Sequence, residues 1–426
     1  MILKQSTAIN EEVKMTMGCT DPGAVAYAAA KAAHLLGDEL KSIDVVLSRS
    51  VYKNALFVHV PIVKKCGVEL AALLGALVKR PEMKLTVLAG VDSDMLESLK
   101  DVAKSISVSV RCLDTDEPLY ISVTCGSGVS RATVVIKGDY DFICHMEKDN
   151  QTLYHCEPKA VSGNNMCRDW SFEELFLSAT EDFDGSSILE YERINREASQ
   201  AGLSEELKLY IERLLQMKDV SISDMANMAR IYVFHASKMR MSGEKVLIAS
   251  LAGSGNLGIT AMLAVSAVCD ARMENPRKRA QAQCLSMMTA IYIKGQMNRL
   301  TVMCGTAIAG AAGAAAATAY LMGGGCKEVK NAVDTVIGSI GGILCDGAKE
   351  SCAFKVGFAA ECGVMSGYMA AKHLGIRQGR GIITGNTDKN IKNLGLINNE
   401  GMTEADNIMI EILNEQKEFQ KYQKRI

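Results

Sequence analysis

Aromatic residues and excess charge of either sign are scarce in this sequence. Only 5% of the 426 residues are aromatic, and Trp170 is the single tryptophan. The 47 Lys and Arg residues nearly balance the 49 Asp and Glu residues, which gives a formal net charge of −2. This balance excludes a polybasic nucleic-acid-binding surface. The 48% hydrophobic and 23% charged residues exclude disorder and predict a folded chain of two or three domains.

Several functional signals are also missing. The N-terminal residues MILKQSTAINEEVKM contain no apolar signal segment and no cleavage site, so we expect a cytoplasmic protein with reduced cysteines. The six histidines show no HxxxH or HExxH spacing, and there is no GxSxG or Walker A motif. Histidine-based zinc catalysis is therefore not expected, and no feature marks a lysine for pyridoxal phosphate.

Two uncharged runs, Val246–Cys269 and Leu300–Cys326, exceed the roughly 20 residues that span a bilayer. They are rich in small residues, which contribute little to membrane insertion, and neither run carries an aromatic belt. We therefore expect no membrane association. The runs predict helices at the centre of a helical domain, apolar on all sides and surrounded by other helices.

Small and flexible residues are what the sequence has in abundance. It contains 36 Gly, 23 Met and 14 Cys residues, a composition that favours helices packed closely against one another. Fourteen thiols are more than core packing usually explains in a cytosolic protein. Each cysteine is therefore a candidate for metal or cluster ligation until its context argues otherwise.

The chain divides into three parts, and the fold class expected is α+β. In residues 39–162, short β-branched runs such as SIDVVLSR, MKLTVLAGV, LYISVTC and ATVVIKG predict strands, while VELAALLGALVK predicts a helix, so this part is an α/β domain. Residues 163–426 predict helices throughout, which makes a large all-helical domain. Residues 1–38 contain the Ala-rich helix DPGAVAYAAAKAAHLLG, which we expect to pack with the helical domain despite the inserted α/β domain.

A glycine-rich loop, GSGNLG at Gly253–Gly258, follows the strand-like run KVLIASLA and matches the GxGxxG pattern of dinucleotide sites. The second strand of such a site, with its acidic residue, is missing. Two readings remain. The loop is a turn between packed helices, or it binds a small carboxylate through free backbone N–H groups at a helix N-terminus.

Cys19 lies in the sequence GCTDPG, just before the Ala-rich helix. Asp21 suits the N-cap position and Pro22 the first helical position, so Cys19 is expected beside a positive helix end that lowers its pKa. An ionised thiol there would be a ligand, a nucleophile or a proton acceptor. A merely buried thiol would be inert, and the spacing alone does not separate these readings.

Three further cysteines form the most informative group. Cys304 lies in MCGTAIAG, and Cys345 and Cys352 flank the turn in CDGAKESC. The absence of CxxC pairs argues against zinc. Three thiolates on helix ends and loops could hold a [4Fe–4S] cluster with one open iron, whereas the alternative is a set of scattered core cysteines. Cys362 is a possible fourth member, and we read the other cysteines as packing residues: Cys66, Cys112, Cys125, Cys144, Cys156, Cys167, Cys269, Cys284 and Cys326.

Three motifs occurring in this order, GCTDP, AGSGNLGI and CDGAKESCAFKV, resemble the L-cysteine desulfidase family. That family is similar to the helical catalytic domain of iron–sulfur L-serine dehydratases. The resemblance covers essentially the whole chain. Its one departure is that the third cysteine of the dehydratases comes later than Cys352 does here, so that assignment follows the desulfidase pattern.

The resemblance implies a [4Fe–4S] cluster held by Cys304, Cys345 and Cys352, with its open iron acting as a Lewis acid. The reaction implied is the α,β-elimination of L-cysteine to pyruvate, ammonia and sulfide, without pyridoxal phosphate. Cys19 is then the proton-transfer group, and the substrate-binding residues are Thr20, Gly253, Ser254, Gly255 and Asn256. The alternatives are an L-serine dehydratase-like deaminase, a non-catalytic iron–sulfur protein that binds an amino acid, and a family member that has lost its cluster and serves as a scaffold.

These assignments predict one pocket. Elimination needs a base at the α-carbon, an anion site for the carboxylate and an electrophile at the β-substituent, all within the length of one amino acid. We therefore expect Cys19, the Gly253–Asn256 loop and the three cysteines to converge. The only partner expected is a small amino-acid substrate, with neither nucleic acid nor membrane, and homodimer formation stays open.

Overall fold

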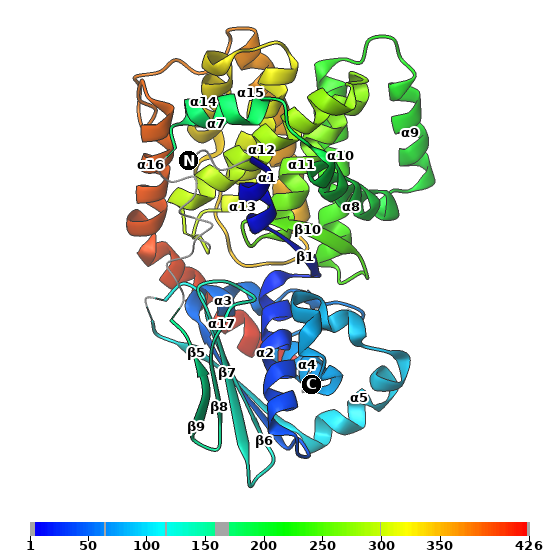
Figure 1. Cartoon of the computed structure of the whole chain (residues 1–426), viewed down its shortest axis with the longest axis vertical. Helices are drawn as coiled ribbons and strands as arrows, with labels where there is room; N and C mark the ends of the chain where they lie inside the picture. Colours follow the sequence, from blue (N-terminus) through cyan, green and yellow to red (C-terminus); the bar gives the residue numbers. More distant parts are fainter. Residues whose placement is uncertain (1–4, 64, 116, 158–169, 299, 424–426) are drawn as a thin grey trace.

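A computed structural model describes residues 5–63, 65–115, 117–157, 170–298 and 300–423. Cys167 and the expected domain boundary between 162 and 163 lie outside the described residues. The fold is mixed α and β, as predicted. Figure 1 shows a helical domain above and a domain built on a six-stranded sheet below.

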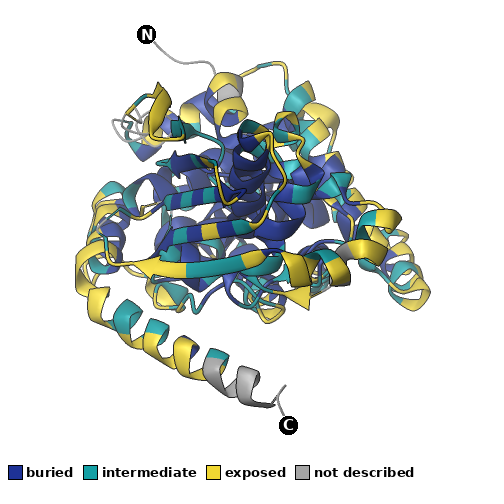
Figure 2. Ribbon diagram, turned by 90° about the horizontal axis from the view of Figure 1, so that it is seen from below, coloured by how far each residue is buried: buried dark blue, intermediate teal, exposed yellow. Residues whose placement is uncertain are grey.

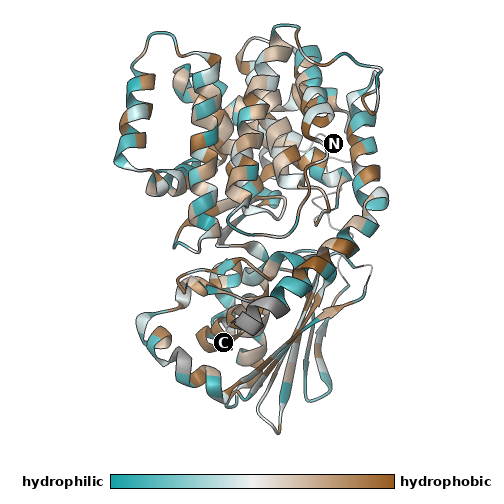
Figure 3. Ribbon diagram, turned by 180° about the vertical axis from the view of Figure 1, so that it is seen from behind, coloured by the Kyte–Doolittle hydropathy of each residue, from teal (hydrophilic) through white to brown (hydrophobic). Residues whose placement is uncertain are grey.

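The helical domain is assembled around α13 (Gly305–Leu321). The neighbouring helices of this domain are α7 (Phe172–Thr180), α8 (Ser186–Gly202), α9 (Glu205–Leu215), α10 (Ile222–Met241), α11 (Gly255–Ala271), α12 (Pro276–Gln296), α14 (Cys326–Ile340), α15 (Cys352–Ala371) and α16 (Thr387–Leu396). Figure 3 shows α9 with alternating teal and brown turns, the pattern of an amphipathic helix that covers the surface.

The two uncharged runs form the centre of this domain, as predicted. Helices α11 and α13 are buried on nearly all sides. Small residues permit their close packing, since a Cβ atom at Gly367 of α15 would lie 2.4 Å from the backbone oxygen of Ala315 on α13. Within the described residues, no helix combines the length and apolar character needed to cross a membrane.

The N-terminal segment joins the helical domain, but not through the helix that we expected. Helix α1 (Gln5–Glu12) places Ile9 in the helical core, and β1 (Val13–Met17) pairs antiparallel with β10 (Leu247–Leu251). The Ala-rich helix α2 (Thr20–Leu36) packs instead on the sheet of the α/β domain. The expectation that residues 1–38 pack as one unit with the helical domain is therefore wrong.

The sheet explains where α2 goes. Its strand order is β5-β2-β6-β7-β8-β9, with β2 parallel to β5 and every other pair antiparallel. Alternate residues of β6 are buried, so the sheet has an apolar face that needs a cover, and α2 and α4 supply it. The elements are β2 (Ser42–Ser48), α3 (Arg49–Ala55), α4 (Val68–Val78), α5 (Ser93–Ser105), β5 (Ser107–Leu113), β6 (Tyr120–Gly126), β7 (Arg131–Lys137), β8 (Ile143–Lys148) and β9 (Gln151–His155).

One predicted strand is a 3-10 helix. The run MKLTVLAGV lies in η1 (Pro81–Gly90), which begins at a proline and is kinked at Lys84, where φ is 46°. Its apolar residues Leu85 and Leu88 are buried in the core of the α/β domain without pairing to a strand. A short hairpin of β3 (His59–Val60) and β4 (Lys65–Cys66) forms a separate two-stranded sheet.

The C-terminal helix α17 (Thr403–Gln423) connects the two domains. The π-helical turn η2 (Ile397–Gly401) leads into it from α16. Helix α17 contacts α3 in two places. Asp406 forms an ion pair with the buried Lys53, and the Tyr52 hydroxyl donates to Asn414 at 3.1 Å. Figure 2 shows that its outer side is exposed. The predicted all-helical unit of residues 163–426 therefore includes a helix that rests on the other domain.

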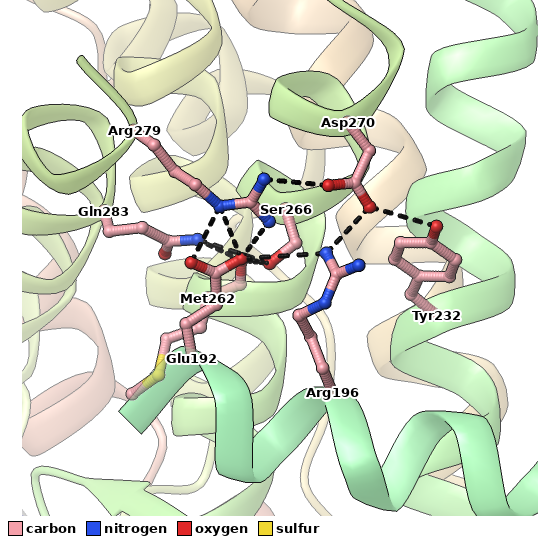
Figure 4. Close-up of polar contacts among 8 residues, drawn as sticks. All are labelled: Glu192, Arg196, Tyr232, Met262, Ser266, Asp270, Arg279 and Gln283. Carbon is pink, nitrogen blue, oxygen red and sulfur yellow. Dashed lines mark hydrogen bonds and ion pairs between the residues drawn. The ribbon is translucent and has the colours of Figure 1, made fainter. Parts of the chain in front are cut away.

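A buried polar network crosslinks four helices of the helical domain (Figure 4). Glu192 of α8 is 3% exposed and accepts hydrogen bonds from Arg279 at 2.9 Å and Ser266 at 2.6 Å. Asp270 accepts from Arg279, Arg196 and Tyr232. The charges of the two carboxylates and the two guanidinium groups compensate one another here, so we interpret this network as a structural element.

Candidate active site

A small cavity lies where the two domains meet. The helical domain lines it with Arg240, Gly253, Ser254, Asn256, Lys294, Leu300, Thr301, Cys304, Gly305, Thr306, Cys345, Ala348, Cys352 and Val356, together with Gly347, and the N-terminal part of the chain adds Cys19, Thr20, Asp21, Asn54 and Tyr140. Its volume is about 90 Å³, far below the roughly 300–1,000 Å³ of ordinary ligand pockets. A dinucleotide is too large for this cavity.

Four helices begin at this cavity. Cys19 is the N-cap residue of α2, Ser254 that of α11 and Cys304 that of α13, and α15 begins at Cys352 itself. A helix N-terminus carries free N–H groups and a partial positive charge. The sequence indicated two of these termini. All four together make the cavity favourable for anionic groups.

Backbone hydrogen bonds bring two of the predicted ligands together. An isolated antiparallel bridge joins Met303 to Leu344, so the residues that follow them, Cys304 and Cys345, belong to one short stretch of paired backbone and lie diagonally across it. The N–H of Cys304 donates to Ile343 at 2.6 Å, and that of Cys345 donates to Val302 at 2.8 Å. The segment before α13 and the loop before α15 are thereby held against each other.

The loop between Cys345 and Cys352 is folded by charge. Asp346 accepts from Lys355 at 2.5 Å and forms an ion pair with Lys349. Burial alone would raise the pKa of Asp346, but the two lysines outweigh it and hold the pKa at about 2. Cys352, at the start of α15, therefore lies in the cavity wall and packs against the apolar cluster that contains Cys19.

The three cysteines predicted as ligands all line this cavity. Among the described residues, no group of three His, Cys, Asp or Glu side chains is arranged to hold a metal ion. Even so, Cys304, Cys345 and Cys352 line the same cavity, and burial together with the nearby Cys345 raises the pKa of Cys304 to about 12. These three thiols are therefore the ones that could reach a group bound in this cavity. Cys362 lies farther along α15, beside Ser366, and is not part of the cavity wall.

The glycine-rich loop also reaches the cavity. Ala252 and Gly253 have φ angles of 45° and 79°, and the Ser254 hydroxyl then caps α11 by accepting from the N–H of Leu257 at 3.3 Å. The same hydroxyl bonds Thr306 at 3.0 Å. Gly253, Ser254 and Asn256 line the cavity, whereas Gly255 lies behind it. The loop is thus the start of α11 at the cavity wall.

Cys19 lies where we predicted, but its pKa shifts the other way. The thiol is 4% exposed, and burial raises its pKa to about 12, with the Asp21 carboxylate adding to the rise and Arg240 opposing it. The expectation that a helix N-terminus makes this thiol partly ionised is wrong, because desolvation outweighs the helix charge. Cys19 reaches the cavity although α2 packs on the sheet of the α/β domain, because only the start of the helix lines the cavity.

Sequence reasoning missed the role of Asp21. The helix begins two residues earlier than expected, so Asp21 does not cap it and is 5% exposed inside the cavity wall. Its carboxylate accepts from Cys19 Sγ at 3.6 Å and from the Tyr140 hydroxyl at 2.9 Å. Burial raises the pKa of Asp21 to about 6, against hydrogen bonds from Tyr140, Asn54 and Cys19. In the sequence, Asp21 stood out only as an acidic residue at the start of an apolar, Ala-rich run.

Two cationic side chains of the wall were also missed. Arg240, in the last turn of α10, is 3% exposed, and Lys294 of α12 is 4% exposed. Lys294 donates to the backbone oxygen of Asn298 at 2.9 Å. Neither residue belongs to a recognisable motif. They add positive charge to a cavity that four helix ends already favour for anions.

Comparison with known proteins agrees with this geometry. The family model of the serine dehydratase alpha chain matches residues 166–411. The chain is also similar to UPF0597 proteins of Methanocella arvoryzae (34% identical, covering 96% of this chain and 97% of the relative) and Clostridioides difficile (31%, 96% and 98%). A UPF0597 protein of Porphyromonas gingivalis is 32% identical over 96% of this chain and 97% of its own. The chain belongs to the serine dehydratase alpha chain family.

Proposed function

We propose that the protein is an L-cysteine desulfidase that uses a [4Fe–4S] cluster and no pyridoxal phosphate. L-Cysteine and water would yield pyruvate, ammonia and hydrogen sulfide. The observation that supports this most is the single cavity that collects Cys304, Cys345, Cys352, Cys19 and the Gly253–Asn256 loop. These segments are far apart in the sequence and have no structural need to share a wall.

In this proposal Cys304, Cys345 and Cys352 hold the cluster, which when bound supplies an electron-pair acceptor for the β-sulfur of the substrate. The chain itself handles the proton. The α-hydrogen leaves as a proton while the Cα electron pair forms the Cα–Cβ double bond and the Cβ–S bond breaks. Elimination releases 2-aminoacrylate, which tautomerises to an imine and is hydrolysed to pyruvate and ammonia.

Cys19 and Asp21 are the proposed proton-transfer pair. Because the buried Cys19 thiol has a pKa of about 12, it serves as an acceptor only after its proton has passed to Asp21, with which it is hydrogen-bonded. The resulting thiolate would be stabilised by the start of α2 and by Arg240. Thr20, the Gly253–Asn256 loop and Tyr140 would hold the substrate and the pair in place.

Elimination of water from L-serine is the second candidate, because the matching family model is that of a serine dehydratase chain. The same cavity and proton-transfer pair would serve both reactions. Anaerobic purification with iron and acid-labile sulfide analysis, followed by assays with both amino acids, separates the two. Sulfide from L-cysteine supports the first, pyruvate from L-serine without activity on L-cysteine supports the second, and iron without turnover supports an amino-acid-binding protein.

Three cysteine variants test the assignments together. Cys345→Ser should lose the iron. Cys19→Ser should keep the iron and lose about 100-fold or more in turnover, because an alcohol is a much weaker proton acceptor than a thiolate. Cys362→Ser is the matched control, since this thiol lies on α15 outside the cavity wall, and it should keep both. Full activity of Cys19→Ser, or loss of iron from Cys362→Ser, would contradict the proposal.

A further inference from the structure

Arg240 is a buried cation that makes no contact ion pair among the described residues, although Asp21 in the same cavity wall is close enough for its charge to act on it. Its side chain lines the cavity and is 3% exposed. Among the described residues, no carboxylate lies within ion-pair distance of the guanidinium, and its Nε has no hydrogen-bond partner. A buried charge is costly unless it is paired, so this arrangement is expected only where an anion completes it.

The two contacts that Arg240 does make hold it in place without neutralising it. Nη1 donates to Asn256 Oδ1 at 3.0 Å, and Nη2 donates to Thr20 Oγ1 at 3.3 Å. Both acceptors are uncharged. One comes from α11 of the helical domain and the other from α2, so the plane of the guanidinium is fixed from both sides of the cavity.

Gly255 makes room for this side chain. A Cβ atom at position 255 would lie 2.3 Å from Arg240 Nε and 2.6 Å from its Cζ. The second glycine of GSGNLG therefore permits the close approach of a guanidinium group, not of a pyrophosphate. The first turn of α11 adds free N–H groups on the same side.

Arg240, Cys19 and the three cysteines line the same cavity. Cys19 and Met241, the chain neighbour of Arg240, belong to one buried apolar cluster, and Cys352 packs against that cluster. An amino acid bound with its carboxylate at Arg240 would therefore present its α-carbon to Cys19 and its β-substituent to the thiols. This order is the one that elimination requires.

We infer that Arg240 binds the α-carboxylate of the substrate, with Thr20, Asn256 and Gly255 as the residues that position it. The ligand class is a free α-amino acid. Amines without the carboxylate are not ligands. The inference deepens the proposed function, but the binding of an amino acid can be tested even if no elimination occurs.

Calorimetric titration of the anaerobically purified protein is the test. The probes are L-alanine, which has the carboxylate but no β leaving group, and ethylamine, which lacks the carboxylate. Wild type should bind L-alanine and not ethylamine, and Arg240→Gln should weaken L-alanine binding by about tenfold or more. The affinity of Arg240→Lys for L-alanine should lie between the affinities of wild type and Arg240→Gln, because lysine keeps the positive charge but cannot bind a carboxylate through two parallel N–H donors. Arg230→Lys, on the same helix but outside the cavity, is the matched control and should bind as wild type does.

Kinetics and a second variant keep the test independent of folding defects. If L-cysteine is turned over, Arg240→Lys should raise its KM by about 10-fold or more and change kcat less. Gly255→Ala should shift the guanidinium and weaken L-alanine binding with Arg240 intact. Melting curves identify any variant that is not folded.

The outcomes are separable. If wild type produces neither sulfide nor pyruvate but Arg240→Gln loses L-alanine binding, the proposed function fails and the role of Arg240 stands. If wild type does not bind L-alanine, or if Arg240→Gln binds it unchanged, the inference is overturned. Slower turnover of Arg240→Gln with unchanged L-alanine affinity would also overturn the inference, since Arg240 would then act only through its charge on Cys19 and Asp21 and not by binding the carboxylate.

Discussion

At the scale of single residues, the candidate site is governed by burial. Cys19 and Asp21 are ionisable groups that are almost completely removed from solvent, and burial raises both pKa values. Their hydrogen bond makes them one unit, so a change at either residue affects the proton that they share. A thiol near a helix start is therefore not reactive by position alone.

Asp21 predicts a pH dependence. With its pKa raised to about 6, the carboxylate that accepts the Cys19 proton is lost below that pH, so turnover should fall as the pH drops through about 6. Asp21→Asn should be slower at every pH and should no longer show this limb. A pH profile of kcat measures it. A limb near 6 that persists in Asp21→Asn would assign the titration to another group.

Stability supplies an independent measure of the same group. The folded pKa of about 6 exceeds the ordinary value of 3.8, so between these values the folded protein binds more protons than the unfolded chain. The contribution of Asp21 to stability is then lost as the pH rises from about 4 to about 6. Denaturant unfolding of Asp21→Asn should show a smaller loss over this range.

The residues found from the sequence are those that belong to local motifs. Cys304, Cys345, Cys352 and Cys19 lie in short segments whose residue types and order carry a resemblance. Arg240 could not be found in this way. Its segment SKMRMSGEK has no motif, and its role depends on an unpaired charge that only the packing of two domains creates.

At the scale of elements, the helical domain could be predicted well and the α/β domain less well. The length and composition of the runs at α11 and α13 require burial on all sides, which only a central position provides. The position of α2 could not be derived, because an Ala-rich helix fits either a helical core or the face of a sheet. The strand predicted at η1 failed since Pro81 and the positive φ of Lys84 interrupt an apolar run.

The network of Glu192 gives a prediction at this scale. Glu192→Ala would leave Arg279 without the carboxylate that it contacts at 2.9 Å and should lower the free energy of unfolding by about 3–5 kcal/mol. Glu192→Gln retains a hydrogen-bond acceptor for Arg279 and should lower the free energy of unfolding by less. Chemical denaturation measures both. A loss below about 1 kcal/mol for the alanine variant would show that Asp270 alone compensates Arg279.

At the scale of the whole molecule, α17 holds the two domains together. Its Asp406 pairs with Lys53, whose side chain is almost fully buried in the α/β domain. The backbone of Lys53 also meets the loop of the cysteines, since a Cβ atom at Gly347 would lie 2.4 Å from its carbonyl oxygen. Stability and the shape of the cavity wall are therefore connected through one residue.

Asp406→Ala should therefore destabilise the protein by about 3 kcal/mol, because it leaves a buried ammonium group unpaired. Replacing both partners, as Lys53→Met with Asp406→Leu, should recover most of the loss. Asn414→Ala removes a neutral hydrogen bond on the same helix and should cost only about 1 kcal/mol. Thermal unfolding compares the three, and an Asp406→Ala variant as stable as wild type would refute the role of the pair.

The cavity has one further consequence because its wall belongs to two domains. Cys19, Thr20 and Asp21 come from the first turn of α2, whereas Arg240 and the three cysteines come from the helical domain. A molecule bound between them acts as a crosslink that raises the cooperativity of the whole chain. Binding of a ligand and association of the two domains would then be coupled, so removal of the ligand would also weaken the association of the domains.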